Sequence, residues 1–248
     1  MNHPDGDRPL LYLCVRPQAG AAEAEYRSFR EAAHRDETRI HARDLVREPL
    51  PDDAFDRYAG FLVGGSPFNV ADPTATKTDV QRRLEDDLER VAEAAASGAT
   101  SALFTCYGIG IVTRMLGGEV TRAYPEDTGP AQITLAAGAA NDPLFGMLAP
   151  RFSALTAHKE GAASAPGGAE LLATNDACPV QAYRVGDTLY ATQFHPEPTG
   201  RAFIERMGVY RDDGYFDARA FDEIAARVLA ASVTEPARIV RAFAARLT

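Results

Sequence analysis

LFTCYGIGIV, residues 103–112, places a cysteine between an apolar run and a glycine-containing segment with helical spacing. The apolar run predicts a buried strand, and the segment after Cys106 predicts a helix that Gly117 and Gly118 end. In open α/β folds, such a strand-to-helix turn lies at the carboxyl edge of the sheet, where ligands bind. Cys106 is therefore either a nucleophile at this edge or a small apolar residue that fills the core.

The rest of the first half alternates apolar runs with amphipathic stretches, which is typical of a parallel sheet covered by helices. Between about 119 and 190 the runs are shorter and turns are more frequent, which predicts a smaller, partly antiparallel region. We therefore expect an α/β fold with a mostly parallel sheet and helices on both faces. The expected elements of the first half are strands at 10–15, 38–45, 58–65 and 100–106, and helices at 22–34, 77–97 and 107–116.

The last part of the chain, 201–248, has helical patterns and is expected to form a C-terminal helical extension. No internal repeat, low-complexity tract or linker interrupts the sequence. A single domain over 1–248 is the simplest organisation.

Composition and charge exclude several classes of protein. The 248 residues are 46% hydrophobic and 25% charged, which is ordinary for a soluble globular protein. The formal net charge of -9 argues against a nucleic-acid partner, because phosphate binding needs clustered Lys and Arg. The apolar run at 10–15 is too short to span a membrane, and the three separated cysteines form no CxxC pair. We expect a cytoplasmic protein with reduced thiols, no membrane contact and a small-molecule or protein partner.

A reactive Cys106 needs an activated thiolate, a base and a group that orients the base. The helix after Cys106 directs its N-terminal dipole toward the thiol and would favour the thiolate. QFHPE, residues 193–197, supplies His195 and Glu197 at the end of an apolar run. Their spacing of two puts both side chains on one face of an extended backbone. In isolation, this pair would better fit a polar strand end at the surface, and the strand-end cysteine upstream shifts the balance.

LVGGSPFNV, residues 62–70, follows an expected strand with two glycines. Backbone N–H groups of such a loop turn inward to stabilise the oxyanion of a tetrahedral intermediate. Gly65 is the expected first donor and Tyr107 the second. On its own, the double glycine also fits a simple tight turn.

The three motifs together resemble the class I glutamine amidotransferase family over residues 61–197, and most closely its stand-alone members similar to the glutaminase part of GMP synthase. The resemblance implies a flavodoxin-like, mostly parallel sheet. It also implies Cys106 as nucleophile, His195 as general base and acid, and Glu197 as the orienting carboxylate. Gly65 and Tyr107 become the oxyanion donors.

Two positions depart from the family pattern. Gly110 stands where the family usually has a Gln that holds the amino-acid part of glutamine, and Ser66 precedes Pro67 where the family loop commonly reads Gly-Gly-Pro. The missing Gln leaves room for a bulkier γ-glutamyl compound, or for another side chain to reach in.

The remaining substrate contacts are implied by the same resemblance. Gly64, Gly108 and Gly110 are expected to leave space for substrate. In TAHKEG, residues 156–161, Glu160 is expected to bind the substrate ammonium group, with His158 and Lys159 supporting the pocket. His158 and Glu160 also form a rival pair for the triad, but without the QFHPE context, and a solvated polar turn is the plain alternative.

No metal or cofactor is expected, because the sequence has no P-loop lysine motif, no HExxH and no full GxGxxG. The favoured hypothesis is an amide hydrolase that releases ammonia from glutamine or a γ-glutamyl amide through a γ-glutamyl thioester, with or without a separate synthetase partner. A γ-glutamyl compound hydrolase or peptidase-like enzyme is the second hypothesis. The third is a non-catalytic binding or regulatory subunit, against which the intact set of Cys106, His195 and Glu197 argues.

Overall fold

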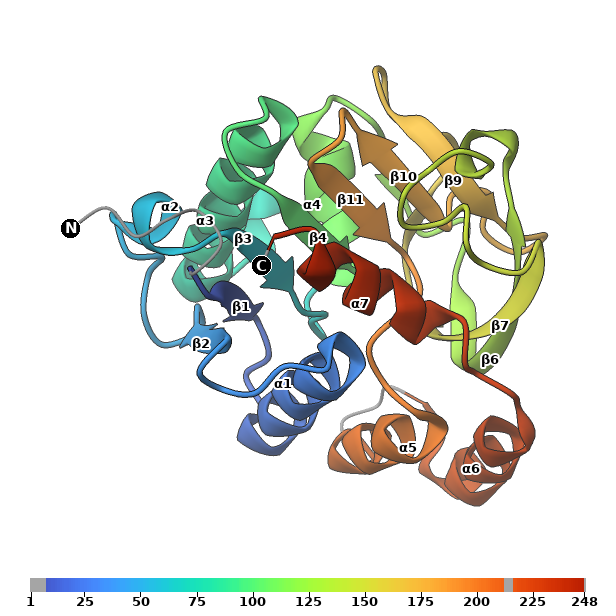
Figure 1. Cartoon of the computed structure of the whole chain (residues 1–248). Coiled ribbons are helices and arrows are strands. Elements are labelled where there is room, and N and C mark those ends of the chain that lie inside the picture. Colours follow the sequence, from blue (N-terminus) through green and yellow to red (C-terminus); the bar gives the residue numbers. More distant parts are fainter. Residues whose placement is uncertain (1–7, 212–215, 248) are drawn as a thin grey trace.

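One mixed sheet organises the computed structural model, which describes residues 8–211 and 216–247 (Figure 1). Within these residues it has nine strands, in the order β2 (Ile40–Asp44), β1 (Leu10–Cys14), β3 (Gly60–Val63), β4 (Ala102–Thr105), β11 (Leu189–Thr192), β10 (Ala182–Val185), β9 (Glu170–Thr174), β6 (Glu126–Leu135) and β7 (Arg151–His158). Strands from β2 to β11 pair in parallel, and those from β11 to β7 pair antiparallel. The expected mostly parallel sheet with a smaller antiparallel region is confirmed.

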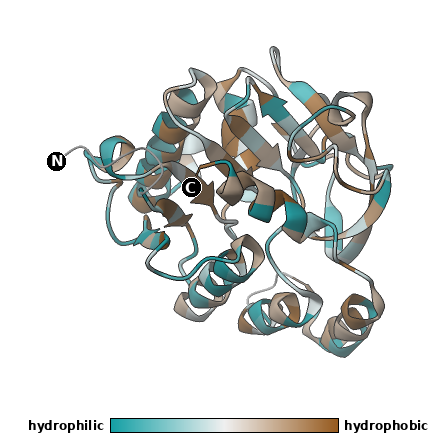
Figure 2. Cartoon of the chain, in the orientation of Figure 1, coloured by the Kyte–Doolittle hydropathy of each residue, from teal (hydrophilic) through white to brown (hydrophobic). Residues whose placement is uncertain are grey.

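Helices cover both faces of the parallel half. Successive side chains of β1 point to opposite faces, as the pleat requires. Tyr12 packs on the Phe29 ring with centroids 5.3 Å apart, whereas Leu13 belongs to the buried cluster that contains Leu84. The central strands β1 and β3 are hydrophobic, while β2 and the helices carry both kinds of residue (Figure 2). The main helices are α1 (Ala19–Ala33) and α7 (Pro236–Ala245) on the Tyr12 side, and α3 (Asp79–Ala96) and α4 (Tyr107–Met115) on the Leu13 side.

The C-terminal helices are built into this core. Helix α5 (Gly200–Val209) and α7 both contact α1, and α6 (Phe221–Ala230) packs on β6 and α5 (Figure 1). Ile239 and Phe243 of α7 are buried against the sheet. The single-domain organisation over 1–248, with a C-terminal helical extension over 201–248, stays a prediction, and residues 1–7, 212–215 and 248 lie outside the described residues.

Several short elements lie outside the sequence prediction. Helix α2 (Ala54–Arg57) precedes β3, and a second, two-stranded sheet pairs β5 (Val120–Thr121) with β8 (Gly161–Ala162). Three 3-10 turns occur at η2 (Thr74–Thr76), η3 (Ala137–Ala139) and η4 (Ala218–Ala220). Among the described residues, no helix has the length and apolarity that a bilayer crossing requires.

Candidate active site

Cys106 occupies the sharp turn between β4 and α4. Its backbone has φ 50° and ψ -102°, in the left-handed region that a side chain with a Cβ rarely adopts. Such a conformation costs on the order of 1–3 kcal/mol and is kept where the surroundings impose it. Here the Cys106 N–H donates to the Thr192 carbonyl of β11 at 2.8 Å, and the thiol donates to the Ala157 carbonyl with Sγ 3.9 Å from the oxygen. The turn thus holds the sulfur above the carboxyl edge of the sheet.

His195 and Glu197 lie beside this turn. The His195 N–H donates to the Leu155 carbonyl of β7 at 2.8 Å, which fixes the segment after β11. Its Nδ1 lies 3.1 Å from Glu197 Oε1, and both side chains are buried. Burial alone would lower the pKa of His195, but the Glu197 carboxylate, with a contribution from Cys106, outweighs it and the pKa is raised. Burial would raise the pKa of Glu197, yet His195 and Arg206 lower it to about 2.

The expected oxyanion donors differ in their surroundings. Tyr107 is the first residue of α4, so its N–H has no acceptor within the helix. Gly65 lies between the site and the Arg16 side chain: an added Cβ would come 2.8 Å from His195 Cε1 and 2.7 Å from Arg16 Nη2. Its N–H donates to Glu25 Oε1 at 3.2 Å. The oxyanion roles of Gly65 and Tyr107 stay predictions, and in this structure the Gly65 N–H is held by a carboxylate.

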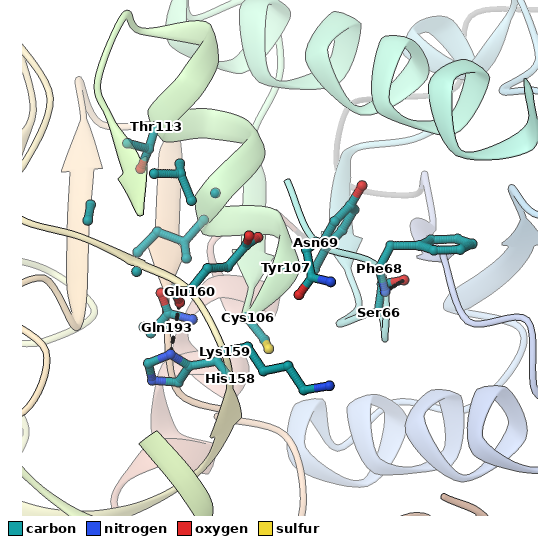
Figure 3. A pocket seen from close by; sticks show the side chains of 15 residues that line it. Ser66, Phe68, Asn69, Cys106, Tyr107, Thr113, His158, Lys159, Glu160 and Gln193 are labelled. Carbon is teal, nitrogen blue, oxygen red and sulfur yellow. Dashed lines mark hydrogen bonds between the residues drawn. The ribbon is translucent and has the colours of Figure 1, made fainter. Parts of the chain in front are cut away.

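A small cavity of about 20 Å³, room for about one water, opens at Cys106. Its lining comes from the loop after β3, from α4 and from the end of β7, and includes Ser66, Asn69, Cys106, Tyr107, Gly110, Thr113, His158, Glu160 and Gln193 (Figure 3). Of the predicted site residues, the structure brings Cys106, Tyr107, Gly110, His158 and Glu160 to this cavity.

Residues 33–207 match the family described as glutamine amidotransferase class-I. The chain belongs to the class-I glutamine amidotransferase family. This confirms the resemblance that the motifs between 61 and 197 indicate.

Relatives of this class-I glutamine amidotransferase differ in what their names describe. Gamma-glutamyl peptidase 3 of Arabidopsis thaliana is 30% identical over 163 residues, covering 62% of this chain and 60% of that protein. A glutamine-hydrolysing GMP synthase of Thermus thermophilus is 31% identical over 173 residues, covering 66% of this chain but only 31% of the synthase. The chain thus spans less than two thirds of either relative. A solved glutamine amidotransferase from Thermotoga maritima, 16% identical, shares the fold with a TM-score of 0.73 over 97% of this chain and 98% of that one.

Gly110, where family members usually carry Gln, faces Val70 in this chain. An added Cβ would lie 3.0 Å from Val70 Cγ2 and 3.6 Å from Glu160 Oε1. The Glu160 carboxylate accepts the N–H groups of Val70 at 2.6 Å and Ala71 at 2.9 Å, and burial raises the pKa of this carboxyl. Val70 and Glu160 therefore occupy the space above Gly110, and Glu160 ties the loop after β3 to the cavity.

His158 does not pair with the Glu160 side chain. Its Nε2 lies 2.8 Å from Glu126 Oε2. Its Nδ1 lies 2.9 Å from the Glu160 backbone oxygen (Figure 3). Asn175 and Gln181 also donate to the Glu126 carboxylate. The rival triad pair is therefore replaced by a His158–Glu126 pair, which sequence reasoning missed because Glu126 lies 32 residues away.

Gly64 and Gly108 serve packing in this structure. A Cβ on Gly64 would collide with the Glu25 carboxylate, and one on Gly108 would lie 3.0 Å from two carbons of Phe104. Neither residue lines the cavity at Cys106. Their roles in substrate binding stay predictions.

A buried charge cluster lies behind His195 and Glu197, the predicted triad residues. Arg206 of α5 places Nη1 2.6 Å from Glu197 Oε1 and 3.1 Å from Glu25 Oε1, and Arg16 Nη2 lies 2.7 Å from the same Glu25 oxygen. All four side chains are at most 3% exposed. We call these four residues, Arg16, Glu25, Glu197 and Arg206, the triad network.

Sequence reasoning missed Arg16, Glu25 and Arg206, although a signal existed. Glu25 lies on the apolar face of α1, four residues after Ala21 and four before Phe29, all buried. Arg206 likewise follows Phe203 by three residues on the buried face of α5. A charged residue on an apolar helix face predicts a buried partner, because an unpaired buried charge is costly.

A second buried carboxylate anchors helix α4, which begins directly after Cys106. Glu85 of α3 accepts from Lys77 Nζ at 2.8 Å, from the Tyr107 hydroxyl at 2.7 Å and from Arg114 Nη1 at 2.7 Å. Gln81 Nε2 adds a fourth donor at 3.0 Å. We call Lys77, Gln81, Glu85, Tyr107 and Arg114 the helix network, because it joins α3 to α4.

Two sets of donor side chains in the described residues are close enough to share a cation: Glu126, His158 and Cys178, and Glu25, His195 and Glu197. In both sets the carboxylates already have protein partners. Arg16 and Arg206 neutralise Glu25 and Glu197, and Glu126 accepts hydrogen bonds from Asn175 and Gln181. Burial raises the pKa of the Cys178 thiol to about 11, which disfavours the thiolate that a metal needs.

Proposed function

We propose that this class-I glutamine amidotransferase hydrolyses a γ-glutamyl amide and releases ammonia, with glutamine as substrate and Cys106, His195 and Glu197 as the triad. One observation carries the proposal: a cysteine in a left-handed turn at the sheet edge lies against a histidine whose Nδ1 is 3.1 Å from a buried carboxylate. This is the arrangement of nucleophile, base and orienting group that acyl transfer requires.

The reaction follows from these positions. The Cys106 thiolate attacks the amide carbon and forms a C–S bond, and the Tyr107 N–H supports the oxyanion. His195 gives its proton to the leaving nitrogen as the C–N bond breaks, so ammonia departs and a γ-glutamyl thioester remains. His195 then takes a proton from water, which attacks the thioester and releases glutamate and the thiol.

Glu160 is the proposed contact for the substrate ammonium group. It is buried at the cavity, and its raised pKa is the expected state of a carboxyl that awaits a cationic partner. A cavity of about 20 Å³ is too small for an amino acid, so binding requires the loop from 66 to 72 to move away from Glu160. The substrate ammonium would then replace the Val70 and Ala71 N–H groups.

We further propose that a separate synthetase uses the ammonia. The similar GMP synthase is named as glutamine-hydrolysing, and the match covers 31% of its length. The remaining part of that protein therefore has no counterpart in the matched segment.

A second candidate is hydrolysis of γ-glutamyl amides with a larger leaving group. Gly110 and the similarity to a γ-glutamyl peptidase favour it. A further cavity of about 330 Å³ adjoins the site, since His158 and Lys159 line both cavities. It offers space for the part of a substrate beyond the scissile amide.

The test is ammonia release from L-glutamine, and amine release from a panel of γ-glutamyl amides, by the wild type, Cys106→Ala and Cys178→Ala. We expect Cys106-dependent turnover of glutamine. Cys178→Ala is the matched control, because it removes a buried thiol away from the His195 side chain and should retain turnover. Turnover of the larger amides alone would favour the second candidate. Equal turnover by wild type and Cys106→Ala would overturn both.

A further inference from the structure

Glu25 makes the largest set of contacts behind the site, yet it does not reach the cavity. Its Oε1 accepts from Arg16, Arg206 and the Gly65 N–H, and its Oε2 accepts from the Tyr12 hydroxyl at 2.7 Å. One carboxylate on α1 therefore joins α5, the end of β1 and the glycine loop.

Glu25 is also close to the reacting groups. Carboxylate oxygens of Glu25 and Glu197 and a ring nitrogen of His195 all lie within 4.8 Å of one another. At this distance in a buried site, the charge on Glu25 is close enough to influence the protonation of His195. Arg206 lies between the two carboxylates and transmits any shift of Glu25 to Glu197.

The triad network has balanced charge but incomplete hydrogen bonding. Its two arginines offset its two carboxylates. Glu197 Oε2, Arg16 Nε, and Nε and Nη2 of Arg206 are buried without a hydrogen-bond partner among the described residues. Buried ion pairs of this kind are a poor source of stability, because desolvation offsets their attraction. The arrangement is better explained by an effect on the site than by folding energy.

We propose that Glu25 is a positioning residue of this hydrolase, which fixes the charge balance around the Cys106–His195 pair and so sets the pH range in which Cys106 reacts. This inference rests on the proposed function only for the identity of the reacting pair. The titratable or charged groups that face Glu25 and His195 are Tyr12 and Cys14 of β1, Arg16 after β1, Cys106, Glu197, Arg206 of α5 and Tyr210 after α5. Tyr12, Cys14 and Tyr210 have raised pKa values, so they stay neutral near pH 7.

The direction of the expected pH shift follows from the net charge of the triad network in each variant. Glu25→Gln keeps an oxygen acceptor but leaves the network with one excess positive charge, which disfavours the imidazolium and favours the thiolate. The pH profile of Cys106 reactivity then moves to lower pH. Arg16→Gln leaves one excess negative charge and moves the profile to higher pH. A purely structural role would impair both variants without shifts of opposite sign.

The experiment measures the rate at which iodoacetamide alkylates Cys106 between pH 5 and 9, with the adduct at Cys106 quantified by peptide mass spectrometry in the full chain. We expect a shift of about one pH unit downward for Glu25→Gln and upward for Arg16→Gln, or about tenfold in rate on the acid limb. Asp142→Asn is the control for loss of a buried carboxylate away from the site and should not shift the profile. Glu160 is present in every variant, so its titration cancels in the comparison.

Unchanged profiles in both network variants, or shifts in the same direction, would overturn the proposal. If Glu25→Gln fails to fold, the sign of the Arg16→Gln shift decides alone. Alkylation needs no turnover, so opposite shifts without ammonia release would refute the proposed substrate and leave the role of Glu25 intact. For an active enzyme, Glu25→Gln should also lower kcat more than it changes KM, because Glu25 does not line the cavity.

Discussion

The triad network and the helix network lie on opposite sides of Cys106, and they differ in how completely their buried charged groups are hydrogen-bonded. In the helix network, Glu85 accepts four hydrogen bonds, and Arg114 keeps a third of its side chain in solvent. In the triad network, every charged side chain is buried and several polar atoms have no partner among the residues described. A saturated carboxylate that joins two helices contributes to stability. An unsaturated cluster beside a reacting histidine is expected to contribute to chemistry instead.

Glu197→Gln should give the largest effect on activity. Glutamine keeps the shape of Glu197 but removes the charge that stabilises the His195 imidazolium and selects its tautomer. We expect ammonia release to fall on the order of 10³- to 10⁴-fold, as for the equivalent change in a Ser-His-Asp triad. Glu85→Gln, the matched change in the helix network, should cost less than about tenfold. Steady-state rates of ammonia release by both variants test this prediction. Equal losses of activity would contradict the expected difference between the two networks.

Replacing one arginine in each network should lower the free energy of unfolding by different amounts. Arg206→Met leaves Glu25 with Arg16 but deprives Glu197 of its arginine, and breaking a buried pair in this way costs about 3–5 kcal/mol. Arg114→Met leaves Glu85 with three donors and removes two ion pairs of a partly exposed arginine, with Glu85 and Glu89, so about 1 kcal/mol or less is expected for each pair. Urea unfolding at pH 7, with the slope compared between variants, measures both values. A larger loss for Arg114→Met would contradict the assignment.

Acid should weaken the triad network selectively. The folded pKa of Glu197 is lowered to about 2, below its unfolded value, so its contribution is present above about pH 4.5 and is lost as the pH falls toward 2. The difference between the folded and unfolded pKa values of Glu197 corresponds to about 3 kcal/mol of unfolding free energy at most. The raised pKa of His195 has the opposite sign: its contribution is present below pH 6.5 and is lost as the pH rises through the folded value. Unfolding free energies of wild type and Glu197→Gln should therefore converge between pH 5 and 2; a constant gap would contradict this.

The helix caps should give the smallest effects. Thr199 accepts from the Ala202 N–H at the start of α5, and Thr78 accepts from the Gln81 N–H at the start of α3. Each Thr→Ala change should cost about 1 kcal/mol. Because α5 carries Arg206 into the triad network, Thr199→Ala should also lower turnover, whereas Thr78→Ala should not. Thermal unfolding and ammonia release of the two variants test this pair.

Local sequence patterns predicted the parallel half of the sheet well. Strands β1, β3 and β4 and the turn at Cys106 lie where buried runs and glycines indicated. The start of β6 was not predicted, because Gly129 and Pro130 interrupt the strand pattern and the pairing with β7 shifts register there. The four-residue helix α2 is too short to give a periodic signal.

In the candidate site too, residues in local motifs were predicted and their distant partners were not. Cys106, His195 and Glu197 were identified from short motifs, since each lies at the end of a strand with a recognisable neighbour. The partners Glu25 and Arg206 are 181 residues apart, and Glu126 is 32 residues from His158. Contacts between such residues depend on how helices and strands pack, which the spacing of residues along the chain does not determine.

In the proposed function, the contact of Glu160 with Val70 and Ala71 also controls access to the thiol. A cavity of about 20 Å³ admits little more than water, so on this proposal a larger reagent meets Cys106 only while the 66–72 loop is detached. Covalent labelling of this cysteine therefore reports two quantities at once, the thiolate fraction and the frequency of loop opening. A comparison of the labelling rate with the rate of loop opening would show whether thiolate formation or loop opening limits the reaction of Cys106. Where opening limits it, the labelling rate of Cys106 measures the motion of the loop.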